Sequence, residues 1–238
     1  MKKILINYAN KKYYEAQKKN SETGLNVAKF DEVISYGFSH IDANFYQKNK
    51  TILDQPRGAG YWLWKPYFIV KTLETMKEGD LLFYCDSGSH FINPIDCLID
   101  VCRTANNNIL LFTLEDFHTH KKWTKRDCFY YMQQDSEPYL STNQILASFV
   151  VCIKNSNNIS FFKEWLEYAQ DSRIITDSPN TCGLPNYSEF KDHRHDQSIL
   201  SLLGRKHKIS TVEDISQWGN DRRTKQIPQI IEHTRSNI

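Results

Sequence analysis

The sequence lacks a surplus of charge of either sign. Its 238 residues include 30 Lys and Arg against 28 Asp and Glu, which gives a formal net charge of +2. Proteins that bind DNA or RNA usually carry a clearly basic face, so this balance predicts no nucleic-acid partner. The one dense basic cluster, within residues 121–126, is most simply a solvated helix face.

Long apolar runs and cysteine motifs are also missing. No segment approaches the roughly 20 apolar residues that a membrane-spanning helix needs. The apolar run near the amino terminus is too short for a signal peptide. The six cysteines show no C-x-x-C pair and no zinc spacing, and Cys85 and Cys152 lie in apolar runs, as buried free thiols do. We therefore expect a soluble cytoplasmic protein without disulfides or a transmembrane segment.

The common phosphate-binding motifs, G-x-x-x-x-G-K-[ST] and G-x-G-x-x-G, do not occur. The segment Arg57-Gly-Ala-Gly-Tyr-Trp-Leu-Trp-Lys-Pro66 offers a different arrangement. Two glycines let the backbone approach a ligand, and Arg57 and Lys65 place positive charge on either side of them. Because a helix is predicted to begin at Pro66, the segment is a candidate diphosphate cradle. The alternative is an aromatic corner past which the two basic side chains extend.

What the sequence does contain is an alternation of strand-like and helix-like segments. Strands are predicted at 4–6, 33–36, 81–85, 109–112, 148–153 and 229–233. Helices are predicted at 11–22, 44–54, 66–78 and 95–105, and two more begin at Ser160, as an N-cap, and at Asp196. The segment 172–190 is predicted to be loop. The pattern predicts one α/β domain, residues 1–238, with a central, mainly parallel sheet flanked by helices.

The strand at 81–85 ends on Asp86 and a glycine turn. In an open α/β sheet, ligands gather at the carboxyl ends of the strands. Asp86 is therefore placed to hold a metal ion or a ribose. The alternative is an Asx turn, in which its carboxylate bonds the local backbone.

Two polar segments of the second half are further candidates. In residues 192–198, the side chains of His193, His195 and Asp196 could ligate a metal. Asp196 could equally be the N-cap of the helix that follows, and the two roles are compatible because helix N-termini also hold anions. Residues 118–127 are polar, aromatic and loop-like, which is typical of a segment that sets acceptor specificity.

Together these segments resemble nucleotide-sugar glycosyltransferases of the GT-A fold, above all the small capsular-polysaccharide, lipopolysaccharide and viral glycan transferases. The resemblance is carried by Asn7-Tyr8-Ala9, residues 57–66, Phe83-Tyr-Cys-Asp-Ser-Gly88, Thr124-Lys-Arg-Asp127 and residues 193–203. It implies one Rossmann-like domain, in which residues 1–115 mainly bind the nucleotide and residues 116–238 mainly bind the acceptor and the donor sugar.

The resemblance also implies a metal site. In such enzymes an Asp-x-Asp motif at a strand end holds a divalent cation, usually Mn²⁺ or else Mg²⁺, on the donor diphosphate. Asp86 matches the first acid, but Gly88 stands in place of the second. Another residue or water would complete the coordination shell, or metal dependence would be weak. His233 lies where related transferases place a carboxyl-terminal histidine ligand.

Similarity to retaining transferases implies that Asp196 bonds donor-sugar hydroxyls and that Gln197 lies beneath the anomeric carbon. The implied donor-binding residues are Tyr8, Tyr36, Arg57, Lys65, Asp86, Ser87, Gly88 and Ser148. The implied acceptor-binding residues are Trp123, Lys125 and Asp127. The expected reaction moves a sugar, with retention, from a UDP-sugar to a hydroxyl of a growing glycan. Such a glycan can be lipid-linked, which is compatible with peripheral membrane association.

Two other functions stay open at this point. One is a non-catalytic module that binds a glycan or nucleotide through aromatic stacking, which the incomplete acidic motif at Asp86 favours. The other is a metal-dependent phosphohydrolase centred on His195 and Asp196. Such sites typically draw further ligands from a mainly helical scaffold, and the alternating strands argue against one here.

Overall fold

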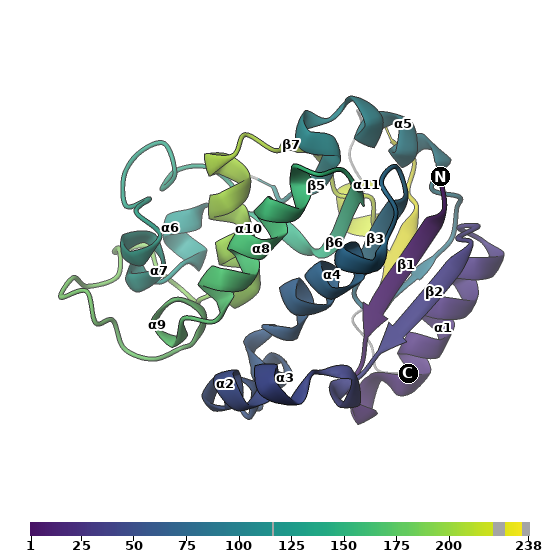
Figure 1. The fold of residues 1–238 in the computed structure, drawn as a ribbon. Coiled ribbons are helices and arrows are strands. Elements are labelled where there is room, and N and C mark those ends of the chain that lie inside the picture. The colour runs from purple at the N-terminus through teal and green to yellow at the C-terminus, as the bar shows by residue number, and fades with distance from the viewer. Residues whose placement is uncertain (116, 221–226, 235–238) are drawn as a thin grey trace.

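The computed structural model describes residues 1–115, 117–220 and 227–234. Its centre is a six-stranded sheet in the order β2-β1-β3-β6-β5-β7 (Figure 1). The strands are β1 (Lys3–Tyr8), β2 (Glu32–Tyr36), β3 (Leu81–Cys85), β5 (Ile109–Thr113), β6 (Ile145–Ile153) and β7 (Ser210–Glu213). Every neighbouring pair is parallel except the two pairs that contain β6. The predicted α/β architecture with a mainly parallel sheet is confirmed.

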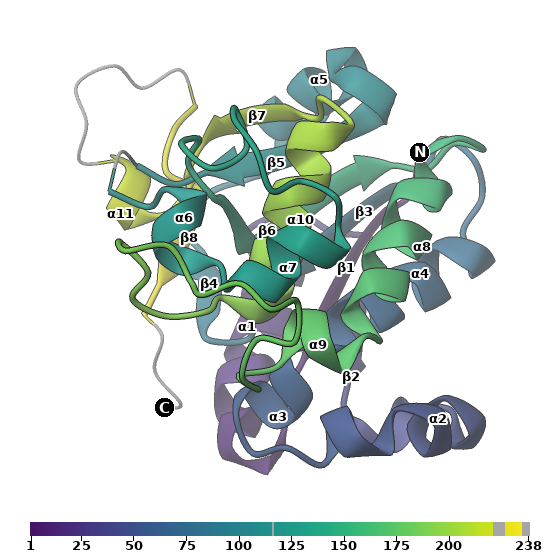
Figure 2. The same ribbon diagram turned by 90° about the vertical axis from the view of Figure 1, so that its left-hand side faces the viewer.

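Helices cover both faces of this sheet (Figure 2). One face carries α4 (Trp64–Thr75), α8 (Asn158–Ala169) and α10 (His195–Lys206), and the other carries α1 (Tyr14–Asn26) and α5 (Asp96–Thr104). Successive side chains of a strand point to opposite faces. In β3, Leu82 and Tyr84 therefore join the first core, whereas Leu81, Phe83 and Cys85 join the second.

Shorter elements surround these layers. The short helices are α2 (Ala43–Leu53), α3 (Gly58–Tyr61), α6 (His120–Trp123), α7 (Arg126–Tyr131), α9 (Ser172–Ile175) and α11 (Gln217–Asn220), with 3-10 turns η1 (Lys11–Tyr13), η2 (Phe38–His40) and η3 (Asn106–Asn108). Strands β4 (Ser89–Phe91) and β8 (Ile231–His233) form an antiparallel pair in which Ser89 faces His233. This pair brings Ile231–His233 beside the turn that follows β3.

Several helix starts differ from the prediction, among them that of α4, which begins at Trp64 and not at Pro66. Helix α8 begins at Asn158, so Ser160 lies inside its first turn, where its hydroxyl donates to the Asn157 carbonyl at 2.6 Å. Helix α10 begins at His195, so Asp196 is not the N-cap, and its carboxylate reaches a buried lysine instead. The predicted loop at 172–190 also contains the short helix α9. At Asp196 a tertiary ion pair replaces the local cap, whereas Ser160 bonds a carbonyl of its own segment and Asp171 caps α9 locally.

Two predicted absences can be compared with the structure. All six cysteines are free thiols, and Cys85 and Cys152 are buried. In the described ranges, no helix is long and apolar enough to cross a membrane.

The turn around α3 has an unusual backbone. Gly58 to Trp62 all have positive φ, from 51° at Ala59 and Tyr61 to 99° at Gly60. This left-handed region costs an L-residue about 1–2 kcal/mol. A Cβ on Gly60 would lie 2.8 Å from the Leu53 Cα. Glycine is therefore favoured at this position both by its positive φ and by the lack of space for a side chain. The turn sets the position of the residues that precede α4.

Gly60→Ala should therefore lower the free energy of unfolding more than Gly79→Ala does. Both positions have positive φ, but a Cβ on Gly79 meets nothing within 4 Å. We expect a loss of about 1–2 kcal/mol at Gly79 from backbone strain, and about 3–4 kcal/mol at Gly60, where overpacking adds to it. Urea denaturation measures both. Equal losses would show that the contact with Leu53 relaxes freely.

Candidate functional site

The candidate site centres on a buried ammonium group between two carboxylates. The Lys65 Nζ lies 2.8 Å from Asp196 Oδ2 and 3.4 Å from Asp86 Oδ1. It also donates a hydrogen bond to the Ala147 carbonyl at 3.0 Å. The Lys65 side chain is 2% exposed, and an ammonium has only three N–H donors. Lys65 therefore lies between the two carboxylates as their shared counter-charge.

Three elements bring these groups together. Asp86 directly follows β3, and its N–H donates to the Ser148 carbonyl of β6 at 2.9 Å. Asp196 lies in the first turn of α10, where its carbonyl accepts from the Trp165 indole at 3.1 Å. Lys65 lies in the first turn of α4. The carboxyl end of β3 and the starts of two helices thus meet at one point.

Burial and neighbouring charges both shift the pKa values in this cluster. Burial raises the pKa of Asp196 to about 6, against the opposing effect of the Lys65 ammonium and with a further rise from the Asp86 charge. Burial alone would lower the pKa of Lys65, but the charges of Asp196 and Asp86 outweigh it and raise that pKa. Above pH 6 the cluster holds two negative formal charges and one positive charge. Its net negative charge is complementary to a cation.

Gln197 is fixed beside this cluster. Its Nε2 donates to Gln144 Oε1 at 2.7 Å, and its Oε1 accepts from the Ala147 N–H at 3.4 Å. The fully buried Gln144 in turn reaches the Trp123 carbonyl at 3.2 Å and the Ser198 hydroxyl at 3.1 Å. Sequence reasoning missed Gln144, because a lone glutamine before a strand has no distinctive local pattern.

Other predicted donor-binding residues gather at the same edge of the sheet. The Ser87 hydroxyl donates to the Tyr8 carbonyl at 2.6 Å, and the Gly88 carbonyl accepts from the Thr234 hydroxyl at 3.1 Å. The rings of Tyr8 and Tyr36 are buried. Tyr8 stacks on Trp64 with ring centroids 3.9 Å apart, and Tyr36 stacks on Phe68 with centroids 4.2 Å apart. One face of each tyrosine ring is thus covered by protein.

Arg57 lies apart from Lys65. Its guanidinium is 2.7 Å from Asp192 Oδ2 and 3.1 Å from Asp177 Oδ2, and its side chain is 40% exposed. The sequence predicts that Arg57 and Lys65 flank one diphosphate cradle. In the structure each of them has carboxylate partners. Those of Lys65 are Asp86 and Asp196 at the end of the sheet, and those of Arg57 lie on the segment between α9 and α10.

The two histidines of residues 192–198 contact the main chain. The His193 Nε2 donates to the Ile174 carbonyl at 2.8 Å, and its Nδ1 accepts from the Lys125 N–H at 3.3 Å. The His195 Nδ1 donates to the Ile175 carbonyl at 2.7 Å. Burial lowers the pKa of His193 well below its usual value and that of His195 to about 4, so both rings are neutral at pH 7.

This arrangement disfavours the phosphohydrolase. Both ring nitrogens of His193 are occupied, and the carboxylate of Asp196 contacts Lys65. Across residues 1–115, 117–220 and 227–234, no group of three or more His, Cys, Asp or Glu is arranged to hold a metal ion.

A metal ion at Asp86 would need ligands from outside the protein. The hydroxyl of Tyr84 and the Lys65 ammonium both contact Oδ1 of Asp86, whose side chain is 25% exposed. The His233 Nδ1 lies 2.5 Å from the Ser89 hydroxyl. One partly exposed carboxylate in a cluster of net negative charge fits a cation that a diphosphate and water help to coordinate.

The predicted acceptor-binding residues shape a loop. The Lys125 Nζ donates to the Ser178 carbonyl at 2.7 Å, and the Asp127 carboxylate accepts from the Thr181 N–H at 2.8 Å. Trp123 is partly exposed, and the Arg194 guanidinium lies 4.4 Å from the centroid of its ring. Lys125 and Asp127 therefore hold the segment between α9 and α10 in place, whereas part of the Trp123 side chain is exposed to solvent.

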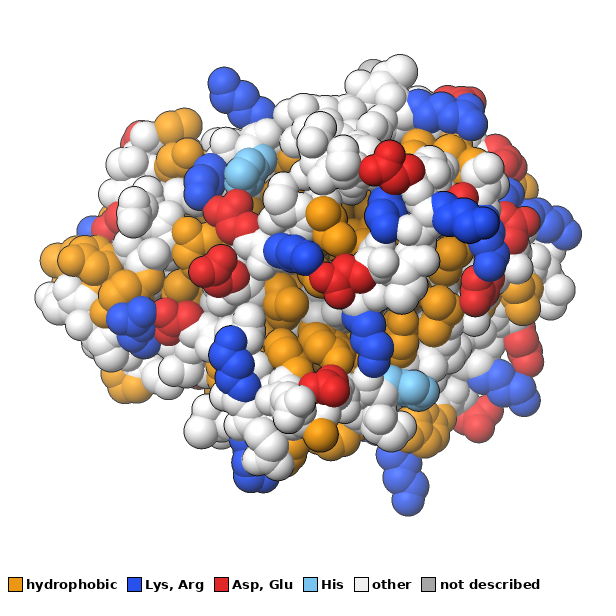
Figure 3. Space-filling model, viewed as in Figure 1, with side chains coloured by type: hydrophobic (Ala, Val, Ile, Leu, Met, Phe, Trp, Pro, Cys, Tyr) orange, Lys and Arg blue, Asp and Glu red, His pale blue; other side chains and the backbone are white. Residues whose placement is uncertain are grey.

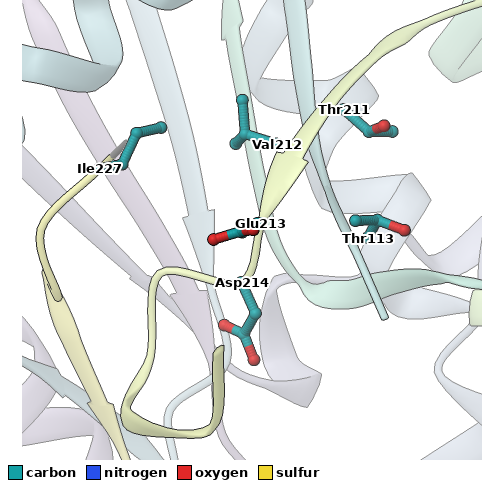
Figure 4. A pocket seen from close by; sticks show the side chains of 6 residues that line it. All are labelled: Thr113, Thr211, Val212, Glu213, Asp214 and Ile227. Atoms are coloured by element: carbon teal, nitrogen blue, oxygen red, sulfur yellow. The ribbon is translucent and has the colours of Figure 1, made fainter. Parts of the chain in front are cut away.

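Two cavities lie outside the central cluster. One of about 230 Å³ lies at the β5–β7 edge of the sheet and is lined by Thr113, Thr211, Val212, Glu213, Asp214 and Ile227 (Figure 4). β7 is three strands away from β3, roughly 14 Å at the usual strand spacing. The other, of about 180 Å³, lies against the segment between α9 and α10 and includes Lys125 in its wall.

Comparison with known proteins supports the fold assignment. No family model matches the chain, and no curated protein matches it in sequence. Among solved structures, the apo crystal structure of mouse xyloside xylosyltransferase 1 matches with a TM-score of 0.51 and 11% sequence identity. The match covers 98% of this chain and 96% of the mouse chain. The protein thus has a GT-A-like glycosyltransferase fold over almost its whole length.

The carboxyl group of Asp196 should titrate with a midpoint near pH 6 in carbon-13 NMR spectra, with Asp196→Asn used for assignment. Lys65→Met should move this midpoint upward, because the carboxylate loses its neighbouring positive charge. Lys71→Met serves as the control, since Lys71 lies on the same helix and bonds the His40 carbonyl. An unchanged midpoint in a folded Lys65→Met protein would contradict the coupling.

Proposed function

We propose that the protein is a glycosyltransferase that moves a sugar from a UDP-sugar to a hydroxyl of a growing glycan, with retention of configuration. The observation that supports this most is the buried Asp86–Lys65–Asp196 arrangement at the carboxyl end of β3. It lies where open α/β sheets bind ligands, in a fold shared with a xylosyltransferase. Within that class, the small capsular-polysaccharide, lipopolysaccharide and viral glycan transferases are the proposed relatives.

In this proposal Asp196 and Gln197 act on the donor sugar. Above pH 6 the Asp196 carboxylate is ionised and can accept hydrogen bonds from sugar hydroxyls. Gln197 is the next residue, and its amide is held at both ends: the oxygen accepts from the Ala147 N–H, and the nitrogen donates to Gln144 Oε1. Both groups can stabilise the positive charge that develops on the sugar as the bond to the diphosphate breaks. The donor nucleotide would lie against Tyr8, Tyr36 and the residues 86–88 and Ser148, with Arg57 at its margin.

A divalent cation, Mn²⁺ or Mg²⁺, would be held by Asp86 and His233, and when bound it would neutralise charge on the departing diphosphate. Tyr84 and Lys65 fix the orientation of the Asp86 carboxylate through Oδ1. Because the protein offers so few ligands, we expect tight cation binding only when the nucleotide is present.

The acceptor would bind at the segment shaped by Lys125 and Asp127 and at the exposed part of Trp123. The comparison with a xyloside-directed enzyme agrees with a glycan acceptor, which can be lipid-linked. On the face in Figure 3, basic and acidic side chains are interspersed, as the balanced composition predicts, and this supports a function without nucleic acid. We place the enzyme in the cytoplasm, with peripheral membrane association where the acceptor is lipid-linked.

Calorimetric titration with UDP and UDP-sugars, with and without Mn²⁺, tests the donor site. We expect saturable binding that Mn²⁺ strengthens, and we expect Asp86→Ala to abolish the effect of Mn²⁺. Asp100→Ala is the matched control, since Asp100 is 79% exposed and pairs only with Arg103 of its own helix among the described contacts. Absence of binding across the UDP- and GDP-sugar panel, with folded protein, would refute the donor assignment.

Steady-state kinetics on a responsive acceptor test the catalytic roles. Asp196→Asn and Gln197→Ala should each lower kcat by about 10²–10³, the usual loss when one group that stabilises transition-state charge is removed. Gln55→Ala is the control, because the exposed Gln55 amide bonds only the Thr51 carbonyl of its own segment among the described contacts. Donor binding without transfer to any acceptor would favour the non-catalytic binding module instead.

A further inference from the structure

The smaller cavity, which we call the loop cavity, has the size of one sugar ring. Its volume of about 180 Å³ equals that of about six water molecules in the liquid. Its lining residues are Lys125, Asp177, Ser178, Pro179, Asn180, Asn186, Phe190, Lys191, Asp192 and His193. All of them belong to residues 116–238, whereas Asp86 and Lys65 belong to the other half of the chain. A single small polar unit fits this space.

The polar groups of the loop cavity include acceptors that face no donor. Arg57 contacts Oδ2 of both Asp177 and Asp192, and each carboxylate side chain is about one third exposed. Oδ1 of Asp177 faces the Nε2 of His195 at 3.7 Å, and this buried nitrogen has no hydrogen-bond partner. His195 is neutral, with its proton on Nδ1, so two acceptors face each other. Asp177 lines the cavity and His195 does not, so a ligand hydroxyl in the cavity would donate to Oδ1 of Asp177.

The charges and the aromatic side chain narrow the class of ligand. The lining contains two lysines and two aspartates, and Arg57 pairs with both aspartates, so a neutral ligand fits without breaking an ion pair. The half-buried Phe190 adds an apolar face to the same wall. Hydroxyl donors together with an apolar C–H face are the features of a neutral pyranose.

The loop cavity also adjoins the candidate donor site. His193 lines the cavity and precedes Asp196 by three residues, so their Cα atoms are at most about 10 Å apart. We propose that the loop cavity binds one neutral pyranose of the acceptor glycan and so selects the acceptor. This inference rests on the proposed function for its acceptor role, but the sugar site itself can be tested separately.

Saturation-transfer NMR in the presence of UDP tests the inference. The probes are the methyl glycosides of glucose, galactose, mannose, xylose, N-acetylglucosamine and glucuronic acid. We expect at least one neutral glycoside to bind, with a dissociation constant that rises about tenfold in Phe190→Ala. Phe117→Ala is the control, because Phe117 is 74% exposed and does not line the cavity. If Phe190→Ala does not fold, Asp192→Asn, which keeps the shape beside Arg57, replaces it.

The outcomes separate this inference from the proposed function. Failure of every neutral glycoside to bind, preference for the glucuronide, or unchanged affinity in the cavity variant would overturn it. Calorimetry with UDP on the same samples reports the donor site independently. UDP binding without glycoside binding would refute the loop cavity alone, whereas glycoside binding without UDP binding would support the sugar site and refute the transferase.

Discussion

The arrangement of the site depends on one buried charge, the ammonium of Lys65. It contacts Asp86 after β3, Asp196 in α10 and the Ala147 carbonyl of β6, and so connects both halves of the chain. Removing one partner from such a buried pair typically costs about 3–5 kcal/mol, because the remaining charge is left in a low-dielectric interior. The two carboxylates therefore stay close together despite their repulsion. Their excess negative charge is what makes the site suited to a cation and to hydroxyl donors.

A second set of contacts connects the left-handed turn at α3 to the segment between α9 and α10. Arg57 pairs with Asp177 and Asp192, and the Tyr61 ring lies 4.8 Å from that of His195, which itself has a φ of 50°. Backbone strain of this kind persists only where surrounding contacts over-determine the conformation, and it is common at functional sites. Here the strained turn contacts the wall of the loop cavity through Arg57.

The two regions divide the proposed reaction between them. The donor edge combines a titratable carboxylate, Asp196, with an amide, Gln197, whose orientation the buried Gln144 sets. The loop cavity has charged groups of both signs in its wall, and both of its aspartates are paired with Arg57. In the proposed reaction the charged diphosphate would bind near Asp196 and Gln197, and the neutral sugar would bind in the loop cavity. The short chain between His193 and Asp196 keeps the two environments adjacent.

The sequence by itself determined the layers of the fold and the place of Asp86. Strand 81–85 was predictable because an apolar run between Gly79 and Asp86 is a local pattern, and the alternation with amphipathic helices implies a parallel sheet. Only the tertiary structure decided the partners of Lys65 and Arg57 and the loop cavity. Ion pairs and cavities form between segments far apart in the chain, and local periodicity contains no information about which distant side chains meet.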